Sequence, residues 1–423
     1  MLRRSLSLSA LLLAACGGGG EAPPRSGPES APPSTEAPPP SSVVAPAPSV
    51  LVGLDDPPPV PDELVVAGPL SDRAAPPHGC VLASDASQPV LAGASTADVL
   101  AVATGFVVAG YVAGSPESVG LARIRPGGAP SPLGRIPLAG SLDASRRTAP
   151  PVLARLGEAT LGVGLVDAAG GVRLVRFEQG SPAPVFATVQ ITPSGADARY
   201  APALASVDAG TLVAWTEASG TTAHVRVALV DAAGAIAATH DVTPEAGSGA
   251  APLFDARGIL YFMDARAGIS VVHRVSFGAD GVPAAATVAQ PLNLTAEPPS
   301  FAVVGTHLGY AAVGNGATRA VGVVTIDSAD RAQALVPGLG YGGPLTIDAE
   351  PLGGAGLFVM EAPGAAEASA PHQTRARVVG ADGTLGEPLA IAGATQPRVA
   401  VAPGGIVAIV ARGADLWWAR CAE

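Results

Sequence analysis

Few residues of this chain have types and spacings that could do chemistry. The six histidines are scattered and show neither the HxH nor the HExxH spacing of a metal site. They are His78, His224, His240, His273, His307 and His372. His273 lies in an apolar run, which favours a packed side chain over a ligand. We therefore predict no metal site and no cofactor.

Nucleophiles and turn carboxylates give no stronger signal. No G-x-S-x-G elbow is present, and a phosphate-binding P-loop is excluded because the chain contains no lysine. Four aspartates recur in predicted hairpin turns, where such a side chain usually accepts a hydrogen bond from its own backbone; calcium binding is the less favoured alternative. They are Asp167, Asp231, Asp280 and Asp382. The sequence therefore predicts no catalytic residue.

The first of three cysteines ends an export signal. Residues 1–16 read MLRRSLSLSALLLAAC, with two arginines before an apolar stretch that is too short to cross a bilayer as a stop-transfer helix. The last four residues, LAAC, resemble the lipobox of bacterial lipoproteins. This resemblance implies that residues 1–15 are a cleaved signal peptide and that the thiol of Cys16 carries a diacylglyceryl group, with fatty acids such as palmitate. An ordinary signal peptide cut near Ala15 is the alternative.

The anchor and the charge together suggest a location. Acyl chains hold a protein on a membrane surface without spanning it. Gly17 stands where an aspartate would suggest inner-membrane retention by resemblance to enterobacterial lipoproteins, so we expect an outer-membrane lipoprotein on the periplasmic or the surface face. The formal net charge of −11 gives no general attraction to nucleic acid.

Residues 16–79 have the composition of a tether. Residues 17–79 begin with GGGG and contain 17 prolines in 63 positions, with no periodic apolar pattern. Such a segment cannot bury enough apolar surface to offset the entropy lost on ordering. We expect a disordered spacer that holds the following domain away from its membrane.

Residues 80–423 repeat a short pattern. A proline-containing step leads into an apolar run seven times, at successive intervals of 62, 51, 50, 47, 45 and 53 residues. These runs are QPVLAG from Gln88, PPVLARL from Pro150, APALASV from Ala201, APLFDAR from Ala251, PPSFAVV from Pro298, GPLTIDA from Gly343 and QPRVAVA from Gln396. We attribute the long first interval to a loop insertion around SLDASRRTAP. A period of this length is typical of repeat architectures.

Each repeat holds four candidate strands. The third is the most uniform and reads VGLARI, VRLVRF, VRVALV, VGVVTI and LWWARC in five of the repeats. Glycine-containing turns follow it. Four short strands in about 50 residues resemble the blade of a bacterial β-propeller, although no sialidase, WD40 or kelch motif is intact. The resemblance implies an all-β domain over 80–423, and a pair of β-sandwiches or a β-helix is the alternative.

One apolar stretch could instead be a membrane helix. Residues 97–114 read ADVLAVATGFVVAGYVAG. The aspartate at one end, three internal glycines and the strand-like counterparts in later repeats favour two strands of a blade.

The other two cysteines bear on ring closure. The seventh repeat has only three candidate strands before the chain stops, while the run from Cys80 resembles the fourth strand of a preceding blade. We therefore predict seven four-stranded blades, with the first and last strands paired and Cys80 beside Cys421. An exported protein can form a disulfide there, and two buried free thiols are the alternative.

The sequence leaves the ligand open. Trp418 is expected in the core and Trp417 could be partly exposed; packing near the disulfide is favoured over a carbohydrate platform. We expect a lipid-anchored envelope β-propeller acting as a binding or scaffold module, with a protein or glycan partner. The alternatives are a lyase or glycosidase with two carboxylates at the channel mouth and a structural envelope protein.

Overall fold

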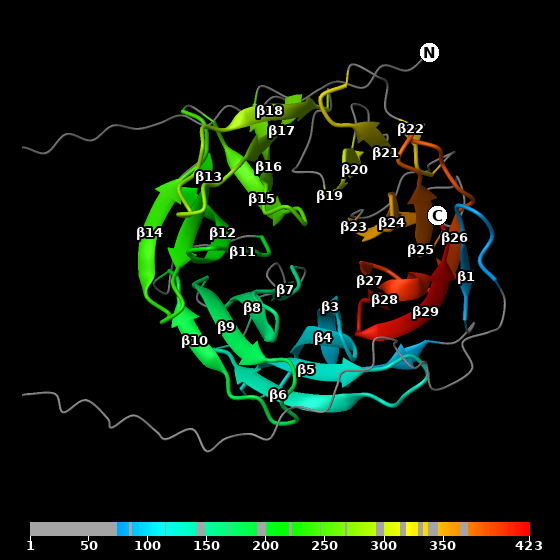
Figure 1. Ribbon diagram of the computed structural model, residues 1–423, viewed down its shortest axis with the longest axis horizontal. Helices are drawn as coiled ribbons and strands as arrows, with labels where there is room; N and C mark the ends of the chain where they lie inside the picture. Colours follow the sequence, from blue (N-terminus) through cyan, green and yellow to red (C-terminus); the bar gives the residue numbers. More distant parts are fainter. Residues whose placement is uncertain are drawn as a thin grey trace, which may run out of the picture. The chain divides into compact units, whose positions relative to one another are not determined.

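The computed structural model describes residues 74–423 apart from short gaps. The longer gaps are 143–148, 193–199, 293–299, 314–318, 337–345 and 364–370. The predicted signal peptide, Cys16 and most of the predicted tether lie outside the described residues. Over the described part, antiparallel strands form seven sheets arranged as the blades of a ring (Figure 1). The predicted all-β propeller of seven blades is therefore confirmed.

Blades 1 to 6 each contain four strands that follow one another along the chain and across the sheet. Blade 1 is β3 (Ala94–Val102), β4 (Gly105–Val112), β5 (Ser118–Ile124) and β6 (Ser131–Pro137). Blade 2 is β7 (Val152–Arg155), β8 (Thr160–Val166), β9 (Val172–Glu178) and β10 (Ala187–Gln190). Blade 3 is β11 (Ala203–Val207), β12 (Gly210–Ser219), β13 (Thr222–Val230) and β14 (Ile236–Asp241). Blade 4 is β15 (Gly249–Phe254), β16 (Leu260–Arg266), β17 (Ile269–Val275) and β18 (Thr287–Pro291).

The remaining blades lie at the C-terminal side. Blade 5 is β19 (Ser300–Val304), β20 (His307–Val313), β21 (Arg319–Thr325) and β22 (Gln333–Ala334). Blade 6 is β23 (Ile347–Leu352), β24 (Ala355–Pro363), β25 (His372–Val379) and β26 (Leu389–Ala392). Blade 7 is β27 (Arg398–Ala402), β28 (Ile406–Ala411) and β29 (Asp415–Cys421), completed by β1 (Cys80–Leu82) and β2 (Gln88–Pro89). In every blade the first strand lies nearest the central axis (Figure 1).

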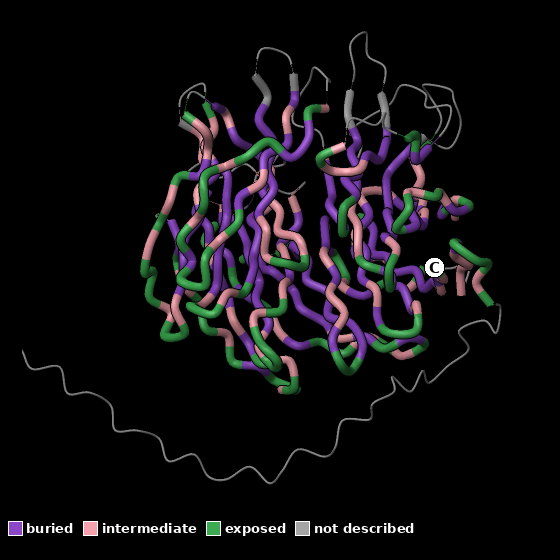
Figure 2. Tube along the Cα trace, turned by 45° about the horizontal axis from the view of Figure 1, so that its top comes forward, coloured by how far each residue is buried: buried purple, intermediate pink, exposed green. Residues whose placement is uncertain are grey.

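Burial follows from the stacking of blades. The second strand of a blade is covered on both faces by its neighbours, so β4 is buried at every position. Exposed residues gather at turns and on the outer strands (Figure 2). The stretch 97–114 forms most of β3 and all of β4, as predicted. No helix among the described residues is long and apolar enough to cross a membrane.

The tight turn between the first two strands depends on glycine in some blades. Gly210 begins β12 with φ +149°, a backbone conformation that L side chains rarely adopt. A Cβ atom there would lie 2.3 Å from the carbonyl oxygen of Val230. Glycine therefore allows β13 to pass close to the hairpin of blade 3.

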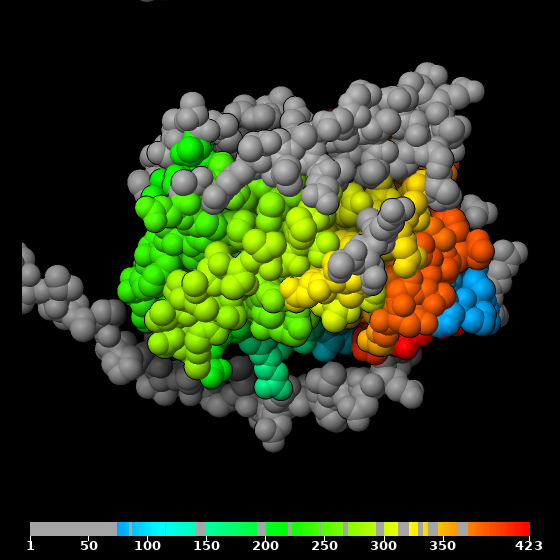
Figure 3. Space-filling view, turned by 90° about the horizontal axis from the view of Figure 1, so that it is seen from above, coloured from blue at the N-terminus to red at the C-terminus, as the bar shows by residue number. Residues whose placement is uncertain are grey.

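The ring closes in blade 7, where the two ends of the domain meet. Cys80 pairs with Cys421 in the register of β1 with β29, and a disulfide joins them across 341 positions of sequence. The predicted first-to-last strand pairing is confirmed and the predicted disulfide is present. The fourth strand is not continuous, however, because β1 and β2 pair with separate parts of β29. Figure 3 shows this N-terminal segment in blue against the orange and red C-terminal strands.

The start of blade 1 differs from the expectation. The run QPVLAG from Gln88 does not form an inner strand, because Gln88 and Pro89 belong to blade 7 and the inner strand β3 starts at Ala94. In blade 1 the inner-strand residue that lines the central channel, Asp98, follows the proline of the run by nine positions (89 to 98). In blade 7 the corresponding residue, Arg398, follows its proline by one position (397 to 398). The long first interval therefore contains extra residues before β3, and the predicted insertion around SLDASRRTAP lies largely outside the described residues.

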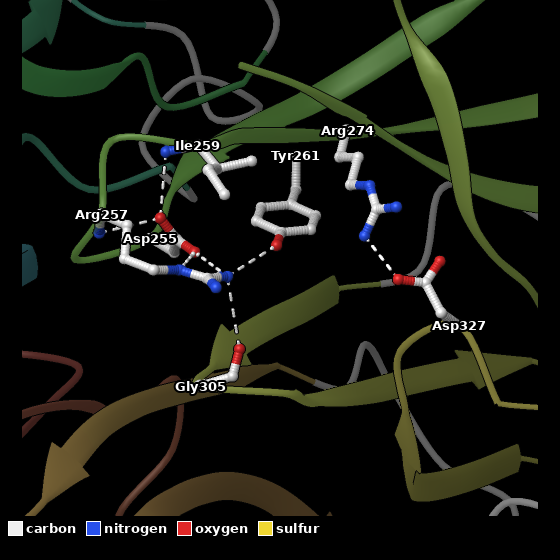
Figure 4. Close-up of polar contacts among 7 residues, drawn as sticks. All are labelled: Asp255, Arg257, Ile259, Tyr261, Arg274, Gly305 and Asp327. Atoms are coloured by element: carbon white, nitrogen blue, oxygen red, sulfur yellow. Dashed lines mark hydrogen bonds and ion pairs between the residues drawn. The ribbon is translucent and has the colours of Figure 1, made fainter. Parts of the chain in front are cut away.

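Polar side chains also join neighbouring blades. Arg274 of blade 4 forms an ion pair with Asp327, with Nη1 2.6 Å from Oδ2, in the turn after the third strand of blade 5 (Figure 4). Arg257 pairs with Asp255 at 2.7 Å and donates to the carbonyl oxygen of Gly305 in blade 5. Both arginines thus join blade 4 to blade 5.

Candidate functional site

A cavity lies in the central channel, among the residues that begin the inner strands. Its volume is about 470 Å³, and every blade contributes to its wall. We call the side of the ring on which the inner strands begin the inlet face. Because propellers bring one strand of each blade to the axis, seven segments far apart in sequence meet here. A cavity of this size suits a small molecule.

One level of the channel wall carries most of its polar groups. In four blades the inner strand carries a polar residue at the same distance from its end. This residue stands four positions before the last inner-strand residue that pairs with the second strand: 98 before 102, 300 before 304, 348 before 352 and 398 before 402. These residues are Asp98, Ser300, Asp348 and Arg398. They belong to blades 1, 5, 6 and 7, which are consecutive around the closed ring. The channel is therefore polar on one arc.

Three of these side chains bind the backbone of the next blade. The backbone N–H of Leu153 donates to Asp98 Oδ2 at 2.7 Å, and the N–H of Val399 donates to Asp348 Oδ2 at 2.9 Å. Ser300 Oγ accepts from the N–H of Ile347 at 3.1 Å. An inner strand has one edge without a partner strand, so these bonds satisfy N–H groups that would otherwise stay unpaired. Each aspartate uses one oxygen in this way and keeps the other.

The remaining charges lie beside these two aspartates. Arg398 Nη1 is 3.9 Å from Asp348 Oδ1, and both side chains keep about a quarter of their surface exposed, 25% and 26%. Glu350 follows two positions later on β23 and lines the same cavity. No hydrogen bond or ion pair joins Glu350 to another described residue. Three carboxyl groups thus share a single guanidinium.

Burial disfavours the ionised form of all three carboxyl groups. Desolvation raises the pKa of Asp98 to about 7, opposed by the charge of Arg398 and increased by that of Asp348. Desolvation also raises the pKa of Glu350 to about 8, with Asp348 and Asp98 adding to the shift. The pKa of Asp348 is raised by desolvation as well, and Arg398 opposes the change. These groups lie deep among protein atoms, and the exposure they retain is to the cavity that they line.

The opposite arc of the channel is apolar. Blades 2, 3 and 4 present prolines at the inlet face, and Tyr200 lies just before the proline step of blade 3. The prolines are Pro150, Pro202 and Pro252. Close to the level of Asp98, blades 2 and 3 carry Val152 and Ala203, and Val152 adjoins the Leu153 N–H that donates to Asp98. The cavity therefore has an acidic side and an apolar side.

This arrangement lacks the features of a metal centre. Within the described ranges, no group of three or more His, Cys, Asp or Glu side chains is placed to hold a metal ion. Three histidines instead pair with one carboxylate each, on blades 3, 4 and 6. These pairs are His224 with Asp241, His273 with Asp264 and His372 with Glu361.

The residues singled out from the sequence lie elsewhere. The disulfide of Cys80 and Cys421 is on the outermost strand pair of blade 7, away from the channel, and Cys16 lies outside the described residues. His273 is packed, with its ring stacked on Phe262. Trp417 and Trp418 are both 7% exposed, which agrees with the favoured prediction of packing, and the partial exposure considered for Trp417 is not found.

The turn aspartates behave as predicted. Each accepts a hydrogen bond from a backbone N–H in its own turn, at distances of 2.8–3.1 Å. The donors are Gly171 for Asp167, Ala235 for Asp231, Val282 for Asp280 and Thr384 for Asp382.

Sequence reasoning missed the channel carboxylates. A signal was present, since Asp98 and Asp348 interrupt apolar runs at corresponding positions of two repeats. In blade 1 this signal is hard to recognise, because the run QPVLAG matches the first run of the other repeats and precedes the strand that contains Asp98. The charge cluster also depends on the closed ring, which places blade 1 beside blade 7.

Comparison with known proteins identifies the fold and nothing finer. No known family model matches the sequence, and no curated protein matches it. Among solved structures, virginiamycin B lyase from Staphylococcus aureus superposes with a TM-score of 0.51 at 10% identity, covering 81% of this chain and 99% of that one. Two further structures superpose with lower scores. Endo-arabinase from Bacteroides thetaiotaomicron has a TM-score of 0.36 at 11% identity, covering 64% of this chain and 93% of that one. TolB from Acinetobacter baumannii has a TM-score of 0.35 at 12% identity, covering 65% of this chain and 62% of that one.

Proposed function

We propose that this protein is a lipid-anchored β-propeller of the bacterial cell envelope that binds a small polar ligand in the inlet half of its channel. The cavity of about 470 Å³ with carboxyl groups on one arc carries the binding part of this proposal. The anchor rests on the LAAC sequence at Cys16 and on the proline-rich segment that follows it. A disulfide between Cys80 and Cys421 suits an exported protein.

The site supports binding more than hydrolysis. A glycosidase needs one carboxyl group held protonated and another held ionised, so their environments must push the two pKa values apart. Here burial raises the pKa of Asp98, Asp348 and Glu350 together. In addition, one oxygen of each aspartate is occupied by the backbone of the neighbouring blade.

The anchor can be tested on protein extracted from its native membrane. We expect the wild type to partition into detergent with an acylated Cys16 as its first residue, and Cys16→Ser to appear in the soluble fraction. An unmodified N-terminus in the wild type would contradict the anchor and leave the channel proposal standing.

The binding site can be tested in the same preparation. Small molecules retained by the purified protein would be compared by mass spectrometry between the wild type and Val152→Trp. Val152 is half-buried at the channel wall of blade 2, so the indole should fill the cavity without entering the core. We expect a molecule retained by the wild type and lost from the variant, with the unfolding midpoint unchanged. Equal retention by both proteins would place the ligand outside the channel.

A further inference from the structure

The two arcs of the channel define a chemical class of ligand. Resting on the channel site of the proposed function, we infer that the cavity binds an organic cation with an apolar body, whose ammonium group lies between Asp98 and Glu350. The class follows from three features of the wall: its charge balance, its unpartnered carboxyl group and its apolar side.

The charge balance of the wall favours a cation. Asp98, Asp348 and Glu350 oppose the single charge of Arg398, which leaves two negative charges when all are ionised. Arg398 lies beside Asp348, so its charge is largely offset by that neighbour. An anion would meet the two other carboxyl groups in a space of low dielectric and be repelled.

Glu350 supplies the group that lacks a partner. Its side chain lines the cavity and keeps part of its surface exposed there, and no described side chain or backbone N–H bonds to it. A charge-assisted hydrogen bond from an ammonium would give this carboxyl group a partner in a space of low dielectric. The second oxygen of Asp98, which does not accept from Leu153, offers a further acceptor.

The apolar side of the wall selects the rest of the ligand. Prolines of blades 2 to 4, together with Val152 and Ala203, line the part of the cavity opposite the carboxylates. A hydrocarbon or aromatic body would bury its apolar surface there. A small hydrated ion such as sodium would leave this side unused.

Binding of a cation should release protons. The raised pKa values of Asp98 and Glu350 keep these groups partly or mainly protonated near pH 7 in the empty site. A cation favours their ionised forms and lowers both pKa values, so protons leave as it binds. The charged groups that face them are Asp348 of β23 and Arg398 of β27. Affinity should therefore rise with pH until the carboxyl groups are ionised, while an alkylamine stays charged up to about pH 10.

The test is a matched series of probes measured by isothermal titration calorimetry on the folded propeller: 4-phenylbutylamine, 4-phenylbutanol and 4-phenylbutyrate. These share an apolar body and differ in the charge of the head group. We expect the amine to bind about tenfold more tightly than the alcohol at pH 8, and the carboxylate to bind most weakly. Titration in two buffers of different ionisation enthalpy should show proton release with the amine alone.

Variants assign the effect to the cluster. Glu350→Gln should weaken amine binding by about tenfold and reduce the proton release, while alcohol binding stays within about twofold. Glu158→Gln, an exposed carboxylate in the first turn of blade 2, is the matched control and should bind as the wild type. Equal affinities for amine and alcohol, or tightest binding of the carboxylate, would overturn the cation class and leave the channel site intact. If no probe binds and the native preparation retains no channel-dependent molecule, the proposed function fails as well.

Discussion

The ring has two unlike halves: a seam half of blades 6, 7 and 1, and a far half of blades 2 to 5. The seam half contains the disulfide, the divided outer strand and the charged residues Asp98, Asp348 and Arg398. The far half is built from uninterrupted stretches of chain, and its blades 2 to 4 present an apolar wall to the channel. The part of the ring where the two ends of the domain meet thus also carries most of the candidate site.

This coincidence has a structural consequence. Asp98 lies near the start of the domain, and Asp348 and Arg398 lie near its end, yet β3 packs directly against β27 once the ring is closed. Closing the seam therefore assembles the charge cluster. If different contacts join the blades in the two halves, substitutions in the two halves should lower the free energy of unfolding by different amounts.

The largest expected effect concerns one tryptophan in each half. Trp418 of blade 7 packs its ring against Phe106 of blade 1, with centroids 5.3 Å apart, and Trp215 is buried in blade 3. We expect Trp418→Ala and Trp215→Ala each to lower the free energy of unfolding by about 3–5 kcal/mol, because each leaves a large cavity between blades. The midpoint of urea unfolding measures this. A loss below about 1 kcal/mol for Trp418→Ala alone would mean that packing contributes little to the seam.

The next effect belongs to the disulfide. Replacing both Cys80 and Cys421 by serine should lower the free energy of unfolding by about 2–5 kcal/mol; the loop-entropy limit for 341 positions is about 5–6 kcal/mol. Reduced wild type should match the double variant in urea unfolding, and the variant should not respond to reductant. Amine binding in the channel should weaken with it, since the seam holds Asp98 beside Arg398. Unchanged stability would show that strand pairing alone closes the ring.

A smaller effect separates two arginines at equivalent positions of the third strand. Arg176 of blade 2 donates to the carbonyl oxygens of Val230 and Asp231 in blade 3, at 3.1 and 2.8 Å. Arg420 is its counterpart at the seam, and no hydrogen bond or ion pair joins its side chain to another described residue. We expect Arg176→Met to cost about 1–3 kcal/mol and Arg420→Met less than about 0.5 kcal/mol, measured as the loss of unfolding free energy. Equal losses would show that the seam is joined by the same polar contacts as the far half.

The last effect is the pH dependence of stability. A carboxyl group whose pKa is raised by folding binds its proton more tightly in the native state, so it stabilises the fold at low pH. That contribution is lost as pH rises from the ordinary pKa of Asp98 towards about 7, and of Glu350 towards about 8. The decline in unfolding free energy between pH 5 and pH 8 should be shallower in Asp98→Asn than in the wild type. Val152→Asn, on the apolar channel wall of the far half, should leave the slope unchanged.

The sequence predicted the fold well because the repeats carry local signals. Apolar runs of strand length, glycine-containing turns and a period near 50 residues recur along residues 80–423, and they specify four-stranded units wherever the chain folds. The incomplete last repeat and the run from Cys80 also predicted the ring closure and the disulfide. The turn aspartates were read correctly, since their hydrogen bonds span only a few residues.

The candidate site could not be predicted in this way, because its residues meet only in the closed ring. Asp98 and Glu350 are separated by 252 positions in the sequence, and each looks like a single charge in an apolar strand. Their shared cavity, the burial that raises their pKa values and the nearby charge of Arg398 exist only after blade 1 packs against blade 7. Local sequence therefore determined the blades, whereas the tertiary structure decided which charges share a channel, because electrostatic coupling depends on distance in space and on burial.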